Sequence, residues 1–285
     1  MSVKSRLIPA QRQQRIMNAL AHEHVMSFKQ ISELLDVSEM TVRRDVAQLA
    51  DAERVGITQG GVTIANRLLA EPRREIKATT EMGDKVSIAR EASRLVKDSM
   101  TIYLDAGTTI QAMRPFIESV SGLTIVTNDF GTINEFFHVP GVDLIFVGGR
   151  VEQDNQSTMG RLAAQTIGAL TLDIAFISSS SWDIRHGMTT PTEAKIDPKL
   201  AAQKAATELV LVADSSKYGK FAKYRVFDLT DFDTIITDTG VPDDDAARIE
   251  ALGTHVIRTP HASQRENASQ REDAQQREDA QHSEA

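Results

Sequence analysis

The chain has 285 residues, of which 41% are hydrophobic, and a formal net charge of −8, which suits one large or two ordinary domains. Because it has no cysteine, disulfides, thiolate metal sites and a cysteine nucleophile are excluded. No apolar run approaches the roughly 20 residues that span a bilayer, and the start of the chain has no apolar signal-like stretch, so we expect a cytoplasmic protein without a membrane partner.

The charge is unevenly distributed along the chain. Residues 1–77 hold 12 Lys and Arg against 9 Asp and Glu, a net charge of +3, whereas the remaining residues hold 20 against 31, a net charge of −11. A mildly basic domain joined to a larger acidic one suits a protein that binds DNA at one end. The asymmetry is modest, so it supports this layout without deciding it.

Three helices are predicted in the first fifty residues. The first runs from Pro9 to about residue 21. The Ser-x-x-Gln pattern at 27–30 is a capping box that begins a short second helix. Ser38 is a good N-cap for a third helix that runs to about residue 50, because its hydroxyl can accept a free backbone N–H in the first turn. The second and third helices, joined by only a few residues, are typical of a helix-turn-helix.

The third helix has two different faces. Its apolar residues recur at spacings of four and three and form one face: Val42, Val46 and Leu49. Thr41, Arg43 and Arg44 lie largely on the other side, near the positive end of the helix dipole. Hydroxyl and guanidinium groups there suit a surface that meets a DNA groove and its phosphates. The alternative is an ordinary helical hairpin with a solvated basic face.

A β-hairpin is predicted after the helices. Two short apolar runs, 55–57 and 62–64, flank a Gly-Gly turn. Beside a helix-turn-helix such a hairpin is a wing, which usually contacts the DNA backbone, so Gln59 and Gly60 are candidate DNA-binding residues. We place the DNA-binding domain at 9–65 and interpret the polar, proline-containing stretch 66–81 as a linker.

Strands alternate with helices from residue 82 to residue 258. This alternation predicts a mostly parallel, doubly wound α/β sheet with helices on both faces, and we assign effector sensing to this domain. Residues 261–285 carry a six-residue repeat without large apolar side chains. We expect that tail to be disordered and assign it no function.

Small and polar residues collect where the predicted strands end, and ligands of open α/β sheets bind outside those carboxyl ends. The residues are Asp105, Gly107, Thr108, Thr109, Thr127, Asn128, Gly149 and Lys217. The Gly-Thr-Thr run enters a helix, where free N–H groups and hydroxyls can cradle a phosphate, and the lysine can add a positive charge. Each of these alone also fits a turn or an N-cap, but together they indicate a pocket for a small anion.

A long polar loop, 182–199, can cover this pocket. Glu193 and His186 in the loop could form a general acid/base pair. No nucleophile or metal site accompanies them in the sequence, so we favour a role in binding the ligand or in ordering the loop. We expect no catalytic activity, no cofactor and no metal.

Several motifs occur in one order along the chain. They are Val37-Ser-Glu-Met-Thr-Val-Arg-Arg-Asp45, Gln59-Gly-Gly-Val62, Asp105-Ala-Gly-Thr-Thr109, Thr127-Asn128, Gly148-Gly149, Asp214-Ser-Ser-Lys217 and Thr237-Asp238. In that order they resemble the motifs of the DeoR-type bacterial transcriptional regulators. The chain departs from the family where Gln59 stands for His, where Gly56 and Ile57 occupy a usually basic part of the wing, and where 178–181 is a serine run.

The resemblance implies a winged helix and a sensor domain related to ribose-5-phosphate isomerase, which binds a phosphorylated sugar, a sugar acid or a similar catabolite. By motif, Ser38, Thr41, Arg43 and Arg44 then belong to the DNA surface, and Gly107, Thr108, Thr109 and Lys217 to the effector site. We expect a repressor of a carbohydrate-catabolic operon that binds double-stranded operator DNA as a homodimer or homotetramer. The alternatives are a sugar-phosphate isomerase with an accessory DNA-binding domain and an architectural DNA-binding protein without a ligand.

Overall fold

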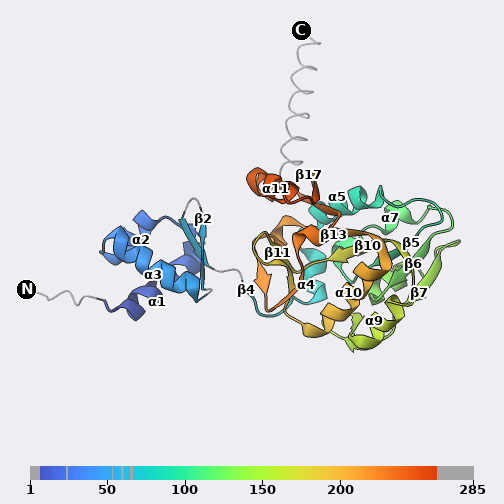
Figure 1. The fold of residues 1–285 in the computed structure, drawn as a ribbon, viewed down its shortest axis with the longest axis horizontal. Coiled ribbons are helices and arrows are strands. Elements are labelled where there is room, and N and C mark those ends of the chain that lie inside the picture. Colours follow the sequence, from blue (N-terminus) through green and yellow to red (C-terminus); the bar gives the residue numbers. More distant parts are fainter. Residues whose placement is uncertain (1–6, 24, 53, 59–60, 65–66, 262–285) are drawn as a thin grey trace, which may run out of the picture. The chain divides into compact units, whose positions relative to one another are not determined.

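The computed structural model describes residues 7–23, 25–52, 54–58, 61–64 and 67–261 (Figure 1). The chain divides into two compact units between Arg67 and Leu68. Gln59, Gly60 and the repeat tail from residue 262 lie outside the described residues. Within the described ranges, no helix has both the length and the apolar character that crossing a membrane requires.

The first unit contains the predicted helix-turn-helix and hairpin. Its elements are α1 (Pro9–Glu23), β1 (Val25–Met26), α2 (Phe28–Leu35), α3 (Glu39–Asp51), β2 (Val55–Thr58) and β3 (Gly61–Ile64). The strand β1, which the sequence did not predict, pairs antiparallel with β3 and gives a sheet in the order β1-β3-β2. Gly61 permits this close approach, because a Cβ there would overlap the carbonyl of Met26.

The apolar faces of the three helices meet in the core of this unit. Its fully buried members include Ile16, Leu20, Ile31, Val42, Val46 and Val62. Burying each of these side chains stabilises the fold by about 1.5–3 kcal/mol relative to exposure. The predicted capping box is present: Ser27 Oγ accepts from the Gln30 backbone N–H at 3.1 Å, and Gln30 Oε1 accepts from the Ser27 N–H at 2.8 Å. Local capping and apolar spacing therefore fix α2 where the sequence places it.

The second unit is built on a seven-stranded sheet in the order β17-β16-β13-β10-β5-β6-β7, with every pair parallel. The strands are β5 (Thr101–Leu104), β6 (Thr124–Thr127), β7 (Asp143–Phe146), β10 (Leu172–Ser178), β13 (Ala206–Val212), β16 (Thr234–Asp238) and β17 (His255–Thr259). The longer helices are α5 (Met82–Ser93), α8 (Phe130–Phe136), α9 (Arg161–Ile167), α10 (Ile196–Ala205) and α11 (Asp243–Glu250). The mixed α/β class with a parallel sheet is confirmed.

Shorter elements connect these strands and helices. They are β4 (Arg67–Leu68), α4 (Arg74–Thr79), α6 (Thr108–Gln111), α7 (Arg114–Ile117), β8 (Arg150–Glu152), β9 (Ser157–Met159), β11 (Ser181–Asp183), β12 (Gly187–Thr190), β14 (Phe221–Ala222) and β15 (Tyr224–Phe227). Three 3-10 helices add η1 (Glu193–Lys195), η2 (Ser215–Lys217) and η3 (Leu229–Asp231) within the described chain. The predicted loop 182–199 therefore contains two strands of a small antiparallel sheet and one 3-10 turn.

Helices cover both faces of the large sheet. Successive strand residues point to opposite faces, so Ala175 belongs to one apolar cluster and Phe176 to the other. The first cluster also contains residues of α9, α10 and α11: Ala163, Ala202 and Ile249. The second contains residues of α5, α6, α7 and α8: Ile88, Ile110, Ile117 and Phe136. Burial on both faces explains why the strands read as continuous apolar runs.

The expected linker, 66–81, is not a separate connector. From Leu68 the chain belongs to the second unit, and within this stretch Arg74 and Lys77 are only 7% and 9% exposed. The composition is misleading, because these charged side chains are buried against charged and amide partners of the sensor domain. We call residues 68–81 the strap.

The strand order changes direction between β5 and β10. From β5 the chain proceeds through β6 to β7 at one edge, and from β10 it proceeds through β13 and β16 to β17 at the other. These two central strands are neighbours in register, with Ile102 opposite Ile174 and Leu104 opposite Phe176. Ligands of open α/β sheets bind at such a switch point, outside the carboxyl ends of the strands. A ligand site is therefore expected after Leu104 and Ser178.

Candidate DNA-binding surface and effector site

The N-terminus of α3 presents the predicted DNA-facing residues. Ser38 caps the helix, and its Oγ accepts from the Thr41 N–H at 3.3 Å and lies 3.0 Å from Thr41 Oγ1. Arg43 and Arg44 are exposed. The Arg43 guanidinium also lies over the Phe28 ring of α2, 4.2 Å from its centroid, a cation–π contact that limits the positions this side chain can adopt. Arg44 is thus the less constrained of the two arginines.

Asp45, the last residue of the same motif, points away from this surface. It is 2% exposed and accepts from Arg12 of α1 at 2.6 Å (Nε to Oδ2) and 2.9 Å (Nη2 to Oδ1). Paired, two-point hydrogen bonds of this kind fix orientation as well as adding energy. The Arg12–Asp45 pair therefore holds α3 against α1. The buried side of α3 packs on α1, and its exposed side carries Arg43 and Arg44.

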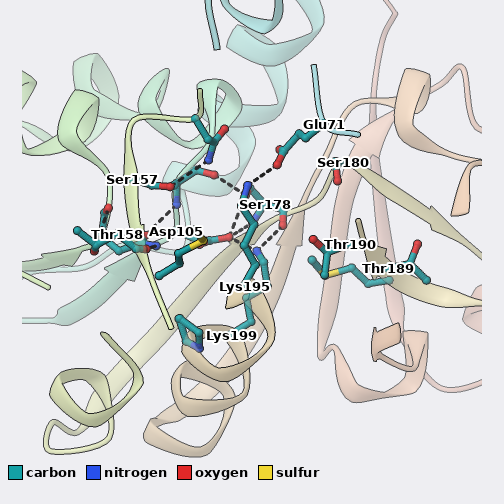
Figure 2. Close-up of a pocket in the computed structure, with 16 residues that line it drawn as sticks. Glu71, Asp105, Ser157, Thr158, Ser178, Ser180, Thr189, Thr190, Lys195 and Lys199 are labelled. Atoms are coloured by element: carbon teal, nitrogen blue, oxygen red, sulfur yellow. Dashed lines mark hydrogen bonds and ion pairs between the residues drawn. The ribbon is translucent and has the colours of Figure 1, made fainter. Parts of the chain in front are cut away.

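Asp105 organises the switch point of the sensor sheet. It follows β5 and is 3% exposed, and its Oδ2 accepts from the Ser178 N–H at 3.1 Å and from Ser178 Oγ at 2.9 Å. Lys199 of α10 forms an ion pair with the same carboxylate and donates to the Ser178 carbonyl at 2.9 Å. Figure 2 shows these three residues converging from β5, β10 and α10. These bonds and the ion pair join the ends of the two central strands.

Asn128 extends this junction to β6. Its side-chain oxygen accepts from the Ala106 N–H at 3.1 Å, and its amide donates to the Thr158 carbonyl at 2.9 Å. Both bonds fix the side-chain orientation at the rim of the site. The Ser178 Oγ also lies 2.7 Å from the Ala106 carbonyl and shares its single proton between this oxygen and Asp105 Oδ2, so the loop after β5 is held from both sides.

Two cavities adjoin at this junction and share Glu71, Ala106 and Ser178 in their walls. The other residues of the first are Asp105, Asn128, Asn155, Ser157, Thr158, Met159, Ser180, Met188, Thr189, Thr190, Lys195, Pro198 and Lys199, and Figure 2 draws its lining. The other residues of the second are Lys77, Lys85, Gly107, Thr108, Thr109, Ser179, Val212, Asp214 and Lys217. The two linings together hold five lysines and three carboxylates, an excess of positive charge that favours an anionic ligand.

The predicted phosphate cradle lines the second cavity. Gly107 precedes α6, and a Cβ there would lie 2.7 Å from Ser178 Cβ, so only glycine lets the two strand ends meet this closely. Lys217 reaches the same cavity from η2, where its Nζ lies 3.1 Å from Ser216 Oγ and 3.9 Å from Asp214 Oδ2. A weakly held ammonium group beside a glycine-threonine turn is a suitable partner for a phosphate.

Glu71 of the strap stands in the wall between the cavities. Its carboxylate accepts from Lys77 at 2.9 Å and forms an ion pair with Lys195. Burial alone would raise the pKa of Glu71, but the charges of Lys195 and Lys77 outweigh it and lower the pKa to about 2. Burial also lowers the pKa of Lys77 and of Lys85, because a low-dielectric environment disfavours the ammonium form. A ligand anion would relieve that cost.

Two family profiles match the chain along most of its length. The DeoR-like helix-turn-helix domain matches residues 12–67, and the DeoR C terminal sensor domain matches residues 80–239. The chain belongs to the DeoR family. It is a DNA-binding transcriptional regulator with a sensor domain, as the resemblance of its motifs predicted.

Relatives of this DeoR-family protein match over nearly their whole length. An "Uncharacterized HTH-type transcriptional regulator" of Haemophilus influenzae is 37% identical over 89% of this chain and 99% of its own. Transcriptional repressor AccR of Agrobacterium fabrum is 26% identical over 80% of this chain and 89% of its own. A solved structure of ribose 5-phosphate isomerase A from Methanocaldococcus jannaschii matches 47% of this chain and 53% of that chain, with 19% identity and a TM-score of 0.34. That partial overlap carries no argument about activity.

Three residues predicted for the effector site of this DeoR-family regulator lie outside both linings. Thr127 is fully buried, donates to the Leu104 carbonyl at 2.7 Å and accepts from the Asp129 N–H at 3.1 Å. Gly149 packs on α9, where a Cβ would lie 3.1 Å from the Cβ of Ala163. Glu193 lies 3.5 Å from the Tyr224 hydroxyl. The contacts of the first two are with neighbouring strand ends and α9.

The less favoured possibility, a Glu193–His186 acid/base pair, is absent among the described contacts of the imidazole. His186 Nδ1 lies 2.7 Å from Asp183 Oδ2, and its ring stacks on Phe221 with centroids 4.4 Å apart. These contacts tie the 182–199 loop to β14. The histidine therefore orders the loop, which was the favoured alternative.

Five charged residues of the linings were not assigned to the site: Glu71, Lys77, Lys85, Lys195 and Lys199. The last two belong to the loop 182–199, which was expected to cover the pocket. Glu71 and Lys77 lie in the segment interpreted as a linker. Lys85, Lys195 and Lys199 lie on helices, where a lysine usually marks a solvated face.

Proposed function

We propose that this protein represses a carbohydrate-catabolic operon and that a phosphorylated sugar or sugar acid, bound at the switch point of the sensor sheet, lowers its affinity for the operator. The observation that carries the proposal is the charge of the two adjoining cavities, with five lysines against three carboxylates. A phosphate monoester is a compact anion of about two negative charges, which matches that excess.

The two cavities suit the two ends of such a ligand. The phosphate would lie in the second cavity, against Gly107, Thr108, Thr109 and Lys217. The sugar hydroxyls would lie in the first, where amide and hydroxyl groups of Asn128, Asn155, Ser157 and Thr190 line the wall. Asp105 would position Lys199 and Ser178 around them, because its own oxygen already accepts from both.

On the DNA side, Ser38, Thr41, Arg43 and Arg44 would meet double-stranded operator DNA in the major groove, and Gln59 and Gly60 of the wing would meet its backbone. We further propose a homodimer or homotetramer, since helix-turn-helix proteins read repeated half-sites. The relative AccR is a transcriptional repressor, which supports repression. The effector would act by population shift, binding the DNA-incompetent state more tightly than the competent one.

A regulator rather than an isomerase is favoured by the state of the cavity carboxylates. Each of Glu71, Asp105 and Asp214 has a lysine nitrogen within 4 Å. A general base must be free to take a proton from the substrate, and Glu71, whose pKa is lowered to about 2 by Lys195 and Lys77, is a weak base. We therefore propose that the site binds its ligand without turnover, and incubation with ribose 5-phosphate should leave the substrate unchanged.

The test is a thermal-shift screen against phosphorylated sugars and sugar acids, each beside its unphosphorylated partner. A ligand specific for the native state raises apparent stability by about 2.7 kcal/mol at a hundredfold excess over its dissociation constant. Lys217→Ala should lose the shift given by the phosphorylated compound, whereas Lys97→Ala, an exposed lysine of the same domain, should keep it. A shift from the unphosphorylated partners alone would contradict the phosphate assignment. Operator binding in mobility-shift titrations should weaken with the same compound.

A further inference from the structure

The strap places a carboxylate of the protein itself in the wall of the effector site. Glu71 contributes to both cavity linings. Its Oε1 accepts from Lys77 of the strap at 2.9 Å, and its Oε2 pairs with Lys195 of η1, 124 positions along the sequence. Two of the five lysines that favour an anionic ligand, Lys77 and Lys195, therefore already pair with the Glu71 carboxylate, as Figure 2 shows for Lys195.

The rest of the strap is held by the same network. Lys77 also donates to Asn155 Oδ1, a residue of the first cavity. Lys85, which lines the second cavity, donates to the carbonyl of Lys77 and to that of Thr80, the latter at 2.6 Å. Three of the five ammonium groups that line the cavities, those of Lys77, Lys85 and Lys195, thus help to hold residues 68–81 in place. Each ammonium group has three N–H donors and Lys77 and Lys85 each use two of them, so a ligand that takes more than one N–H of either lysine weakens these bonds.

The strap also continues without interruption into the DNA-binding unit. Glu71 is four residues after Arg67, the last residue of that unit. A change in how residues 68–81 are held is therefore a change in how the chain leaves the sensor domain. A ligand can shift the equilibrium between two states only through contacts that differ between them. Contacts of the strap that exist in one state and not in the other would meet this requirement.

We propose that Glu71 is a tethered anion beside the effector's phosphate site, and that the effector releases the strap by displacing the Glu71 carboxylate from Lys77, which lines the same cavity as Gly107, and from Lys195. This inference rests on the proposed function, since it names how binding at that site reaches the DNA-binding unit. The carboxylate stays ionised at neutral pH, because the two lysines lower its pKa to about 2. It is thus a true competitor for a phosphate rather than a neutral hydrogen-bonding group.

The test measures hydrogen–deuterium exchange of the full chain with and without inorganic phosphate, with chloride added to equal ionic strength. The informative amides are those of Arg74, bonded to the Asp154 carbonyl at 3.0 Å, and of Lys77, bonded to the Arg73 carbonyl at 3.1 Å. We expect phosphate to accelerate their exchange at least about fivefold, the lower end of typical coupling between sites. Exchange in β5 and β10 should slow or stay constant, which distinguishes strap release from unfolding.

Glu71→Gln removes the tethered anion and keeps the side-chain size. Its strap should exchange rapidly without phosphate, phosphate should add no further acceleration, and its operator affinity without any ligand should fall at least about fivefold. Glu152→Gln is the matched control. Glu152 Oε2 lies 3.7 Å from the same Lys195, with a similar exposure of 22% against 18% for Glu71, but it lies on β8, outside the strap. This variant should behave as the wild type in both measurements.

Failure of this inference can be told from failure of the proposed function. If phosphate raises the melting temperature but leaves strap exchange unchanged or slower, or if Glu71→Gln behaves like Glu152→Gln, the tethered-anion inference is overturned and the effector site stands. If Glu71→Gln frees the strap and weakens operator binding while no phosphorylated compound binds, the strap coupling is supported and the effector class is wrong. Should Glu71→Gln lose protection in β5 and β10 as well, Glu71→Asp decides, since its shorter carboxylate should give intermediate strap exchange.

Discussion

The guanidinium group of Arg74 binds both carboxylate oxygens of Asp129, with Nη1–Oδ1 and Nη2–Oδ2 distances of 2.6 and 3.1 Å. The side chains are 8% and 0% exposed, and Asp129 also caps α8 by accepting from the Thr132 N–H and hydroxyl, each at 2.8 Å. The pair therefore joins the strap to the helix that follows β6. It fixes the position of residues 68–81 on the sensor domain, and Glu71 in the same segment lines the cavities.

Arg74→Met should destabilise the sensor domain by about 3 kcal/mol, because removing one partner of a buried ion pair leaves the other charge uncompensated. Unfolding can be followed by the fluorescence of Trp182, the single tryptophan of the chain, which is fully buried in this unit. The neighbouring Arg73 is the control: it is 71% exposed and pairs with an exposed aspartate, Asp154. Arg73→Met should change stability by less than about 1 kcal/mol. Equal losses for the two variants would contradict the structural role of Arg74.

Gly131→Ala should also destabilise this unit, although the substitution lies in a helix. A Cβ at residue 131, in the first turn of α8, would overlap the guanidinium of Arg74. Helix propensity alone would stabilise the variant by up to about 1 kcal/mol, so the predicted sign is opposite to that of the local effect. In an Arg74→Met background the clash is absent, and Gly131→Ala should become neutral or stabilising in urea unfolding. A stabilising effect in the wild-type background would show that Arg74 does not occupy this space.

The part of the fold that could be predicted is the part determined by local pattern. Ser38 and the spacing of Val42, Val46 and Leu49 place α3, because an N-cap and a 3.6-residue period are properties of neighbouring residues. Strands such as β10 read as apolar runs because both of their faces are buried. The unpredicted β1 has two residues and exists only because Gly61 lets it approach β3.

The candidate site could be predicted only where it follows strand ends. Asp105, Gly107 and Asn128 stand directly after β5 and β6, so the topology rule finds them. Glu71 and Lys199 reach the site from the strap and from α10, and their positions depend on tertiary contacts 94 to 124 residues apart in sequence. A charged side chain gives no sequence signal for which distant partner buries it. For the same reason the strap was interpreted as a linker.

Arg44→Ala should weaken operator binding more than Arg43→Ala. Arg43 lies over the Phe28 ring at 4.2 Å, so part of its role is to join α2 to α3, whereas Arg44 is exposed on the helix face. Losing one phosphate contact should reduce the dependence of log affinity on log salt by about one. Mobility-shift titrations at several salt concentrations measure both quantities. Arg94→Ala, an exposed arginine of the sensor domain, is the control, and a loss for Arg94→Ala equal to that for Arg44→Ala would mean the effect is one of net charge.

The Glu71 ion pairs should make the sensor domain sensitive to acid. The pKa of Glu71 is lowered from 4.5 to about 2 in the folded protein. A carboxyl group with a depressed pKa contributes stability that is present above the pKa of the unfolded chain and is lost as pH falls through the folded value. The window is therefore from about pH 5 down to about pH 2, and the full contribution is on the order of 3 kcal/mol. The net value should be smaller, because burial lowers the pKa of Lys77 at the same time.

The measurement is the difference in free energy of unfolding between the wild type and Glu71→Gln, taken from urea titrations of Trp182 fluorescence across that window. Taking the difference cancels the contributions of the other carboxylates to the free energy of unfolding, because both proteins contain them. The wild type should be the more stable at pH 7, and the difference should shrink steadily below pH 5, since a protonated glutamate and a glutamine hold the two lysines equally poorly. The same difference for Glu152→Gln should stay small, because Glu152 is 3.7 Å from Lys195 and makes no contact with the strap lysine Lys77 in the described interactions. A difference for Glu71→Gln that does not change with pH would mean that the Glu71 carboxylate is not held by charge, and the competition with a phosphate would lose its physical basis.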